Sequence, residues 1–60
     1  MEFLYPDLVV GNLWVHSEKR GGLFVLQLIR NNVVVQEQAF SDWNAYSRRY
    51  DMTRTLAGVL

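Results

Sequence analysis

The sequence predicts an α+β domain in which a three-stranded antiparallel sheet (a β-meander) packs on one C-terminal helix, in the order β-β-β-α. Three observations predict this fold: β-forming residues precede position 41, turn-forming pairs interrupt them, and apolar residues recur at helical spacing afterwards. Sixty residues are expected to form a single small domain over positions 1–60. Because the chain has no cysteine, it depends on a well-packed core or on oligomerisation for stability.

The expected strands cover residues 8–16, 23–30 and 33–40, which are rich in valine, leucine, isoleucine and aromatic residues. We expect a polar loop over residues 17–22, where two glycines supply positive φ, so that His16 pairs with Leu23. A two-residue turn at residues 31–32 is expected to connect the last two strands, because asparagine tolerates the left-handed conformation.

The helix prediction rests on spacing and on its two ends. Ser41 is expected to cap the helix, and Asp42 to lie near the positive end of its dipole. Gly58 is expected to end it. Residues that recur at intervals of three and four define the sheet-facing side, namely Trp43, Tyr46, Tyr50, Thr53, Ala57 and Leu60. Met52 and Leu56 widen this apolar arc beyond what one sheet covers.

Strict alternation along the strands sorts their side chains onto two faces. The face expected beneath the helix is nearly all apolar, apart from Arg30 and Glu37, and contains Val9, Gly11, Leu13, Val15, Phe24, Leu26, Leu28, Val33, Val35 and Ala39. The opposite face is expected to combine large apolar groups with neutral hydrogen-bonding groups and to carry no charge. Since such a surface is typical of an interface, we predict a protein interface of Asn12, Trp14, His16, Gln27, Ile29, Gln36, Gln38 and Phe40.

The titratable residues show no catalytic pattern. His16 is the only histidine, and Ser17 beside it points to the opposite face of an extended strand. The carboxylates form no pair with glycosidase geometry, and the Gly21-Gly22 pair lacks the pattern of a phosphate-binding loop. We therefore expect a protein that is not an enzyme and that uses no cofactor, no metal and no small-molecule substrate.

The charge and hydropathy of the chain indicate which partners and which cellular compartment to expect. Six basic and six acidic residues give a formal net charge of zero, which favours association and exerts little long-range attraction on nucleic acid or membranes. We expect no membrane segment, because such a segment needs ~20 apolar residues, and no secretion signal. With no cysteine to oxidise, the chain is expected to be cytoplasmic.

These observations favour a small protein-interaction module, a homodimer whose partner is a second copy of itself, a host protein or both. A free-standing chain of this size that starts at Met1 is typical of a phage or a mobile element. Such proteins commonly block or adapt a host enzyme by steric binding. The sequence therefore predicts a phage accessory protein that acts as an inhibitor or adaptor by occlusion.

The alternative is a small DNA-binding protein. Basic side chains that can contact phosphates or guanine edges are Lys19, Arg20, Arg48, Arg49 and Arg54. The order of three strands and one helix over residues 8–57 resembles that of integrase arm-binding domains and of one family of plant transcription-factor domains. The resemblance implies a sheet laid in the major groove. Those domains place arginines on the sheet face, whereas the corresponding face predicted here has no cation.

Overall fold

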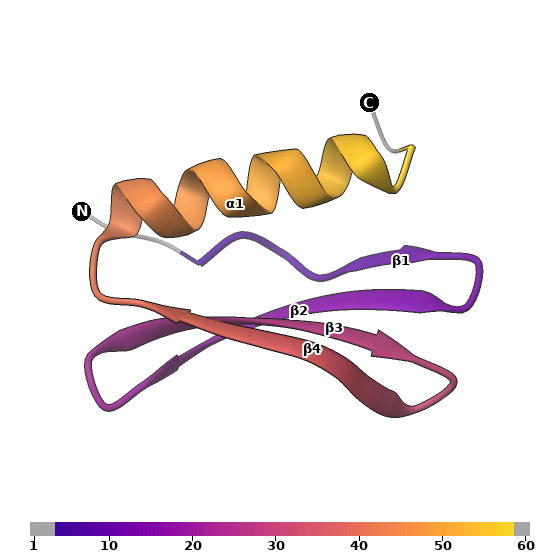
Figure 1. Ribbon diagram of the computed structural model, residues 1–60, viewed down its shortest axis with the longest axis horizontal. Helices are drawn as coiled ribbons and strands as arrows, with labels where there is room; N and C mark the ends of the chain where they lie inside the picture. The colour runs from indigo at the N-terminus through magenta and orange to yellow at the C-terminus, as the bar shows by residue number, and fades with distance from the viewer. Residues whose placement is uncertain (1–3, 59–60) are drawn as a thin grey trace.

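The structure, a computed structural model, describes residues 4–58. The chain forms four strands and a helix, which are β1 (Leu8–Val10), β2 (Leu13–Arg20), β3 (Leu23–Arg30), β4 (Val33–Phe40) and α1 (Trp43–Leu56). The strands make one antiparallel sheet in the order β1-β2-β3-β4, and α1 covers one of its faces (Figure 1). The predicted α+β class and antiparallel sheet are confirmed, but the sheet has four strands and not three.

The extra strand arises because residues 8–16 do not form one continuous strand. The chain reverses at Gly11 and Asn12, and Gly11 adopts a φ of 61°, which glycine tolerates without a steric penalty. β1 therefore folds back along β2, with Val9 opposite Trp14. In one continuous strand Val9 and Trp14 would point to opposite faces, but across the turn they lie opposite each other and share a face. Val9 therefore lies on the face away from the helix and not beneath it.

The polar loop expected over residues 17–22 is also wrong. β2 continues to Arg20, and only Gly21 and Gly22 form the turn, with φ values of 57° and 83°. Positive φ at both central residues is typical of a type I′ turn, one of the two favoured types of two-residue hairpin turn. His16 consequently lies opposite Gln27 and not opposite Leu23.

The turn at residues 31–32 is confirmed, since both asparagines have positive φ and Arg30 lies opposite Val33. A β-bulge then leaves Val35 without a counterpart on β3, so that Leu28 lies opposite Gln36. One extra residue moves every later side chain of a strand to the other face. The bulge therefore reverses the predicted faces of Gln36, Glu37, Gln38, Ala39 and Phe40.

The core lies between α1 and the helix-facing side of β2 and β3. Val15, Leu26 and Tyr46 are fully buried there and pack with Phe24 and Tyr50. The rings of Phe24 and Tyr46 stack, with 5.6 Å between their centroids. The prediction that Val15, Phe24 and Leu26 lie beneath the helix is confirmed.

The N-terminal segment covers one side of this core. The ring of Tyr5 stacks on Tyr50 with 4.5 Å between centroids, and its backbone N–H donates to the Tyr46 hydroxyl at 2.9 Å. The Tyr5 hydroxyl is hydrogen-bonded to Ser47 Oγ at 2.8 Å. These contacts link positions about forty residues apart, which is why no local pattern predicts them.

The helix begins and ends close to the predicted positions. Asp42, and not Ser41, is the N-cap residue, and its side chain makes no capping hydrogen bond. At the other end, the backbone N–H of Gly58 donates to the carbonyl of Thr55, and Gly58 has a φ of 83°. The predicted role of Gly58 in ending the helix is thus confirmed.

The predicted helical face is confirmed for Tyr46, Tyr50 and Thr53, which are buried. Leu60, which the spacing also placed there, lies outside the described residues. The excess of the apolar arc stays uncovered, since Leu56 is 81% exposed and Met52 is 51% exposed. Within residues 4–58, α1 falls short of the length and hydropathy of a bilayer-spanning helix.

Candidate protein interface

The face of the sheet opposite α1 carries a compact group of apolar side chains. Trp14 lies opposite Val9 on one side and Ile29 on the other, and Val34 lies opposite Ile29. Val9 is 72% exposed, Trp14 38% and Val34 49%, whereas Ile29 is buried between them. We refer to Val9, Trp14, Ile29 and Val34 as the open-face patch.

A hollow of about 320 Å³ adjoins the open-face patch and is lined by Trp14, Ile29 and two hairpin turns. The two turns are held together, because the Asn12 side-chain amide donates to Asn31 Oδ1 and the Asn31 backbone N–H donates to the Asn12 carbonyl, each at 3.4 Å. A hollow beside an exposed indole is suited to receive an apolar side chain from a partner.

Asp7 holds the indole of Trp14 in place. Trp14 Nε1 donates to Asp7 Oδ2 at 3.0 Å, and Oδ1 of the same carboxylate lies 3.0 Å from His16 Nδ1. Burial by itself raises the pKa of Asp7, but the hydrogen bonds from Trp14 and His16 outweigh it and bring that pKa below its ordinary 3.8. Asp7 is therefore ionised at neutral pH and accepts both bonds.

A row of polar contacts continues from His16 across the open face. His16 Nε2 lies 3.5 Å from Glu18, which accepts a hydrogen bond from Arg20 at 2.7 Å. Arg20 in turn lies 3.5 Å from Glu37, and Glu37 accepts from Gln27 Nε2 at 2.6 Å. The prediction of an uncharged face is therefore wrong, because the longer β2 and the bulge in β4 bring three charged residues onto it.

The structure brings together only some of the predicted interface residues. Four of them share the open face, namely Trp14, His16, Gln27 and Ile29, and Asn12 lies in a turn at its margin. The placement of Gln36, Gln38 and Phe40 on this face is wrong. They lie opposite Leu28, Leu26 and Phe24 on the helix side, because the bulge at Val35 shifts the register. Sequence reasoning missed Asp7, whose role depends on the turn at residues 11–12.

His16 and Ser17 point to opposite faces, as their alternation predicts. Ser17 Oγ accepts a hydrogen bond from the Tyr46 hydroxyl at 2.8 Å inside the core, whereas His16 contacts carboxylates on the open face. The arrangement assembles no serine–histidine pair. Among the described residues, no three His, Asp or Glu side chains are grouped as metal ligands.

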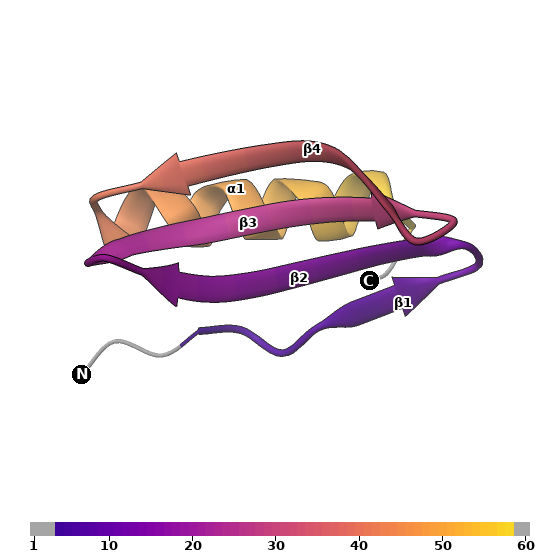
Figure 2. The same ribbon diagram turned by 90° about the horizontal axis from the view of Figure 1, so that it is seen from below.

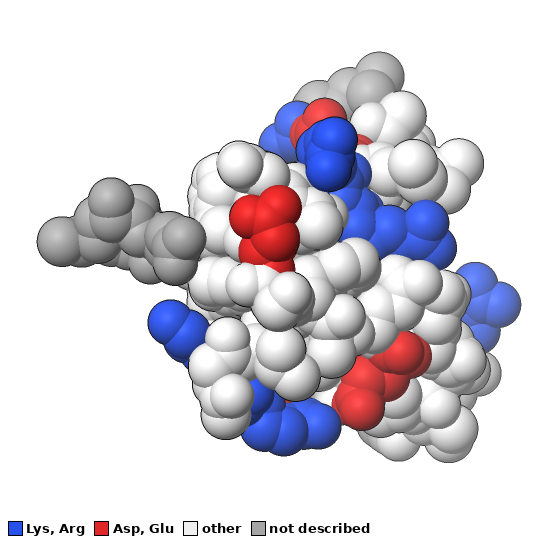
Figure 3. Space-filling view, turned by 60° about the vertical axis from the view of Figure 1, so that its left-hand side comes forward, with Lys and Arg blue, Asp and Glu red and all other residues white. Residues whose placement is uncertain are grey.

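The five basic residues considered for nucleic-acid contact do not share one surface. Arg20 is paired with Glu18, and Arg54 lies 3.5 Å from Asp51. The other three lie at the end of β2 and along α1, namely Lys19, Arg48 and Arg49. Figure 3 shows one run of cationic groups in the upper part of the view, with other cationic groups apart from it at the lower left and acidic groups between them. Strong binding to a phosphate backbone needs a continuous basic surface, so this arrangement gives little support to DNA binding.

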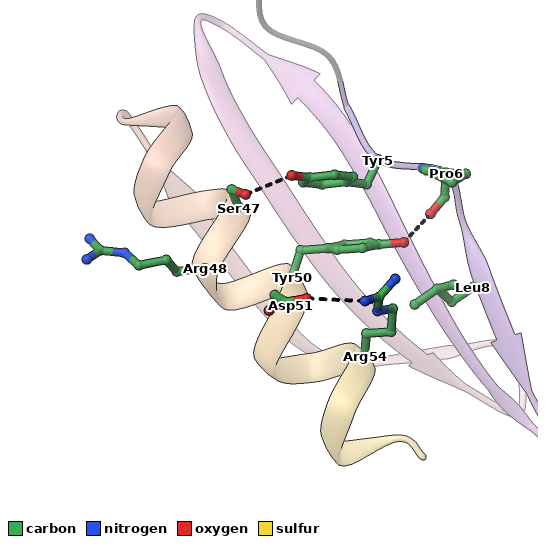
Figure 4. A pocket seen from close by; sticks show the side chains of 8 residues that line it. All are labelled: Tyr5, Pro6, Leu8, Ser47, Arg48, Tyr50, Asp51 and Arg54. Carbon is green, nitrogen blue, oxygen red and sulfur yellow. Dashed lines mark hydrogen bonds and ion pairs between the residues drawn. The ribbon is translucent and has the colours of Figure 1, made fainter. Parts of the chain in front are cut away.

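A groove of about 500 Å³ lies between the N-terminal segment and α1. Figure 4 shows the rings of Tyr5 and Tyr50 along this groove, with Arg48 directed away from it. The Tyr50 hydroxyl donates to the Pro6 carbonyl at 2.8 Å, and Arg54 is paired with Asp51 at the margin. These polar groups bind one another, so the groove is a seam of the fold and not a second candidate site.

Comparison with known proteins leaves the chain without an assigned family. No protein-family model matches it, and no curated protein or solved structure is significantly similar to it. The open face and the edges of the sheet are the features of the chain that bear on its function.

Proposed function

We propose that the chain is a small non-enzymatic protein-interaction module that forms a homodimer and presents its open sheet face to a protein partner. The open-face patch is the observation that carries this proposal. Trp14 lies between exposed Val9 and buried Ile29, and exposed Val34 lies next to Ile29 on the following strand. Tryptophan is enriched among the residues that contribute most to binding energy in protein interfaces.

The surroundings of the patch fit the anatomy of an interface. The apolar side chains of β1 to β4 are bordered by the polar contacts that run from Asp7 to Glu37. An apolar centre with a polar border is the arrangement that protein interfaces share. The bond from Asp7 orients Trp14 before a partner arrives, which lowers the entropy that binding has to overcome.

Binding of this type acts by occlusion. A partner that places an apolar side chain in the hollow beside Trp14 has that part of its own surface covered by the module. For an accessory protein of a phage or mobile element, the covered surface would belong to a host protein in the cytoplasm, which the module would block or adapt.

The test compares Trp14→Ala with a matched control, Leu56→Ser. Both substitutions remove an exposed apolar side chain, but Leu56 lies on α1, away from the open face. Each tagged variant is used to capture proteins from host extract, and a captured species is then purified and titrated by calorimetry. We expect the wild type and Leu56→Ser to bind it equally and Trp14→Ala to lose binding. Equal binding by Trp14→Ala would show that the open-face patch is not the binding surface.

A further inference from the structure

The homodimer of the proposed function needs a contact surface, and the free edge of β4 supplies one. We propose that a second copy of the chain pairs with β4 edge to edge, antiparallel, about a two-fold axis at Gln38. The two sheets then join into one continuous sheet with both open faces on the same side. This inference rests on the proposed function, because it identifies the contact through which the proposed homodimer forms.

β4 forms the rim of the sheet and has a neighbouring strand, β3, on one side only. In Figure 2, β4 runs along the outer border, and α1 lies behind β3 and β4. Val33, Val34 and Val35 are 60%, 49% and 58% exposed. β4 contains neither lysine nor proline, two residues that discourage pairing at sheet edges, and beyond the bulge at Val35 its residues 36–40 are regular, so this part of the edge is a template for another strand.

The hydrogen-bond alternation of the ladder shows which groups of β4 point outward. The two residues that flank the turn at residues 21–22, Arg20 and Leu23, form a hydrogen-bonded pair, so the backbone groups of Leu23 point toward β2. Those of the next residue, Phe24, therefore point toward β4, where Phe40 lies opposite. By this alternation, the backbone N–H and C=O groups of Gln38 and Phe40 face β3. Those of Glu37 and Ala39 face away from the sheet, where the strand of a second copy can bind them.

Charge and the bulge select the register of the two strands. In an antiparallel pair, a residue whose backbone N–H and C=O point toward the second copy must lie opposite a residue of the same kind. These residues alternate along β4, so the two-fold axis passes through a residue and not between two residues. An axis at Glu37 places two carboxylates opposite each other, which is unfavourable. An axis at Gln36 places Glu37 opposite the bulged Val35. An axis at Ala39 pairs only residues 38–40, because Glu37 then lies opposite Ser41 beyond the end of β4. The axis at Gln38 uses the whole regular part of the strand and places Glu37 opposite Ala39 of the second copy.

Gln38 provides an independent reason for the same axis. Its Oε1 is buried and has no hydrogen-bond partner among the described residues. Side chains directly opposite each other in a non-hydrogen-bonded pair approach most closely, so the two Gln38 amides meet across the axis. A change of the Gln38 rotamer on association would bring each buried Oε1 out to accept from the Nε2 of the other copy, which satisfies an acceptor that the single chain leaves unpaired.

The test uses opposite charges at one exposed position of β4. Ala39→Glu places a second carboxylate opposite Glu37 of the other copy, whereas Ala39→Lys places a cation there. From the size of cross-strand charge effects, counted twice by symmetry, we expect Ala39→Glu to weaken the dimer by on the order of tenfold. Ala39→Lys is expected to keep or strengthen it. Sedimentation velocity measures both, with Leu56→Glu and Leu56→Lys on α1 as controls that leave the dimer unchanged.

Amide hydrogen exchange of the wild type locates the contact directly. We expect the amides of Glu37 and Ala39 to exchange more slowly as the protein concentration rises. If these amides exchange equally fast in dimer and monomer, or if both Ala39 variants weaken the dimer equally, the edge contact is overturned and the homodimer stands. If Trp14→Ala separates the dimer and Ala39→Glu does not, the copies bind through the open face. A wild type that stays monomeric removes the homodimer itself.

Discussion

The indole of Trp14 is bound to the carboxylate of Asp7, with 3.0 Å between Nε1 and Oδ2. The bond joins the N-terminal segment to the open face, because Asp7 precedes β1 and Trp14 belongs to β2. The orientation of the proposed binding residue is therefore controlled by a residue outside the patch.

Replacement of Asp7 by alanine is expected to release Trp14 without unfolding the chain. In a Trp43→Phe background, which leaves Trp14 as the only tryptophan, the emission of Asp7→Ala should shift to longer wavelength as the indole gains contact with water. Asp42→Ala serves as the control, since Asp42 is an exposed carboxylate whose side chain makes no capping bond. An identical shift in both variants would mean that Asp7 does not orient the indole.

The same carboxylate predicts a weakening of the fold in acid. The pKa of Asp7 in the folded chain lies below the ordinary value of 3.8, so its contribution to stability is present above pH 3.8 and is lost as the pH falls through the folded-state pKa. The effect is expected to be small, because Asp7 is exposed and solvent screens its interactions. Urea unfolding should show a smaller acid-induced decrease in midpoint for Asp7→Ala than for the wild type.

Tyr46→Phe tests the buried hydroxyl at the centre of the fold. This hydroxyl donates to Ser17 Oγ at 2.8 Å and accepts from the Tyr5 N–H at 2.9 Å. Its removal leaves two groups without that partner, so we expect a loss of about 2 kcal/mol in the free energy of unfolding. Tyr50→Phe removes one bond, to the Pro6 carbonyl, and should cost about 1 kcal/mol. Urea denaturation of both variants measures the difference, and a smaller loss for Tyr46→Phe would contradict the account.

Tyr50 also predicts the response to alkali. Burial, together with the neighbouring Tyr46, raises the pKa of the Tyr50 hydroxyl above its ordinary value of 10.0. The stability that this protonated hydroxyl contributes is complete below pH 10.0 and is lost as the pH rises through the folded-state pKa. Thermal unfolding of the wild type should therefore become easier above pH 10.0, and Tyr50→Phe should show a weaker dependence. Equal slopes in the two proteins would contradict this prediction.

Leu26→Ala tests the position of the core. Leu26 is fully buried between the sheet and α1, and its truncation should cost about 3 kcal/mol through lost contacts and a residual cavity. A sixty-residue domain has little stability in reserve, so this variant should be largely unfolded in mild denaturant. Val33→Ala, at a position that is 60% exposed, should change stability by less than about 0.5 kcal/mol. Circular dichroism during urea titration compares the two variants.

The helix was predictable because its signals are local. The spacing of Tyr46, Tyr50 and Thr53 identifies the buried side, and Gly58 identifies the end. The sheet was predictable only in part. The turn at residues 11–12 interrupts a run of strand-forming residues, and the bulge at Val35 follows two further valines that have the same strand preference. The Gly11-Asn12 pair is itself typical of a two-residue hairpin turn, but it was interpreted as part of one strand. Nothing in the local composition marks the bulge at Val35. Each irregularity exchanges the faces of several side chains.

The candidate interface was predictable to the extent that it depends on β2 and β3. Trp14, His16, Gln27 and Ile29 share a face because both strands keep a regular alternation. Gln38 was placed on the wrong face because of the bulge. Asp7 was missed because it reaches Trp14 only through the fold-back of β1. Tertiary pairing decided these positions, and single-residue preferences did not.

The dimer is tested most directly by the molar mass of the wild type in solution. Sedimentation equilibrium over a micromolar concentration series should give a mass that rises toward twice the 7.0 kDa of the single chain. A mass that stays at 7.0 kDa throughout that series would contradict the account.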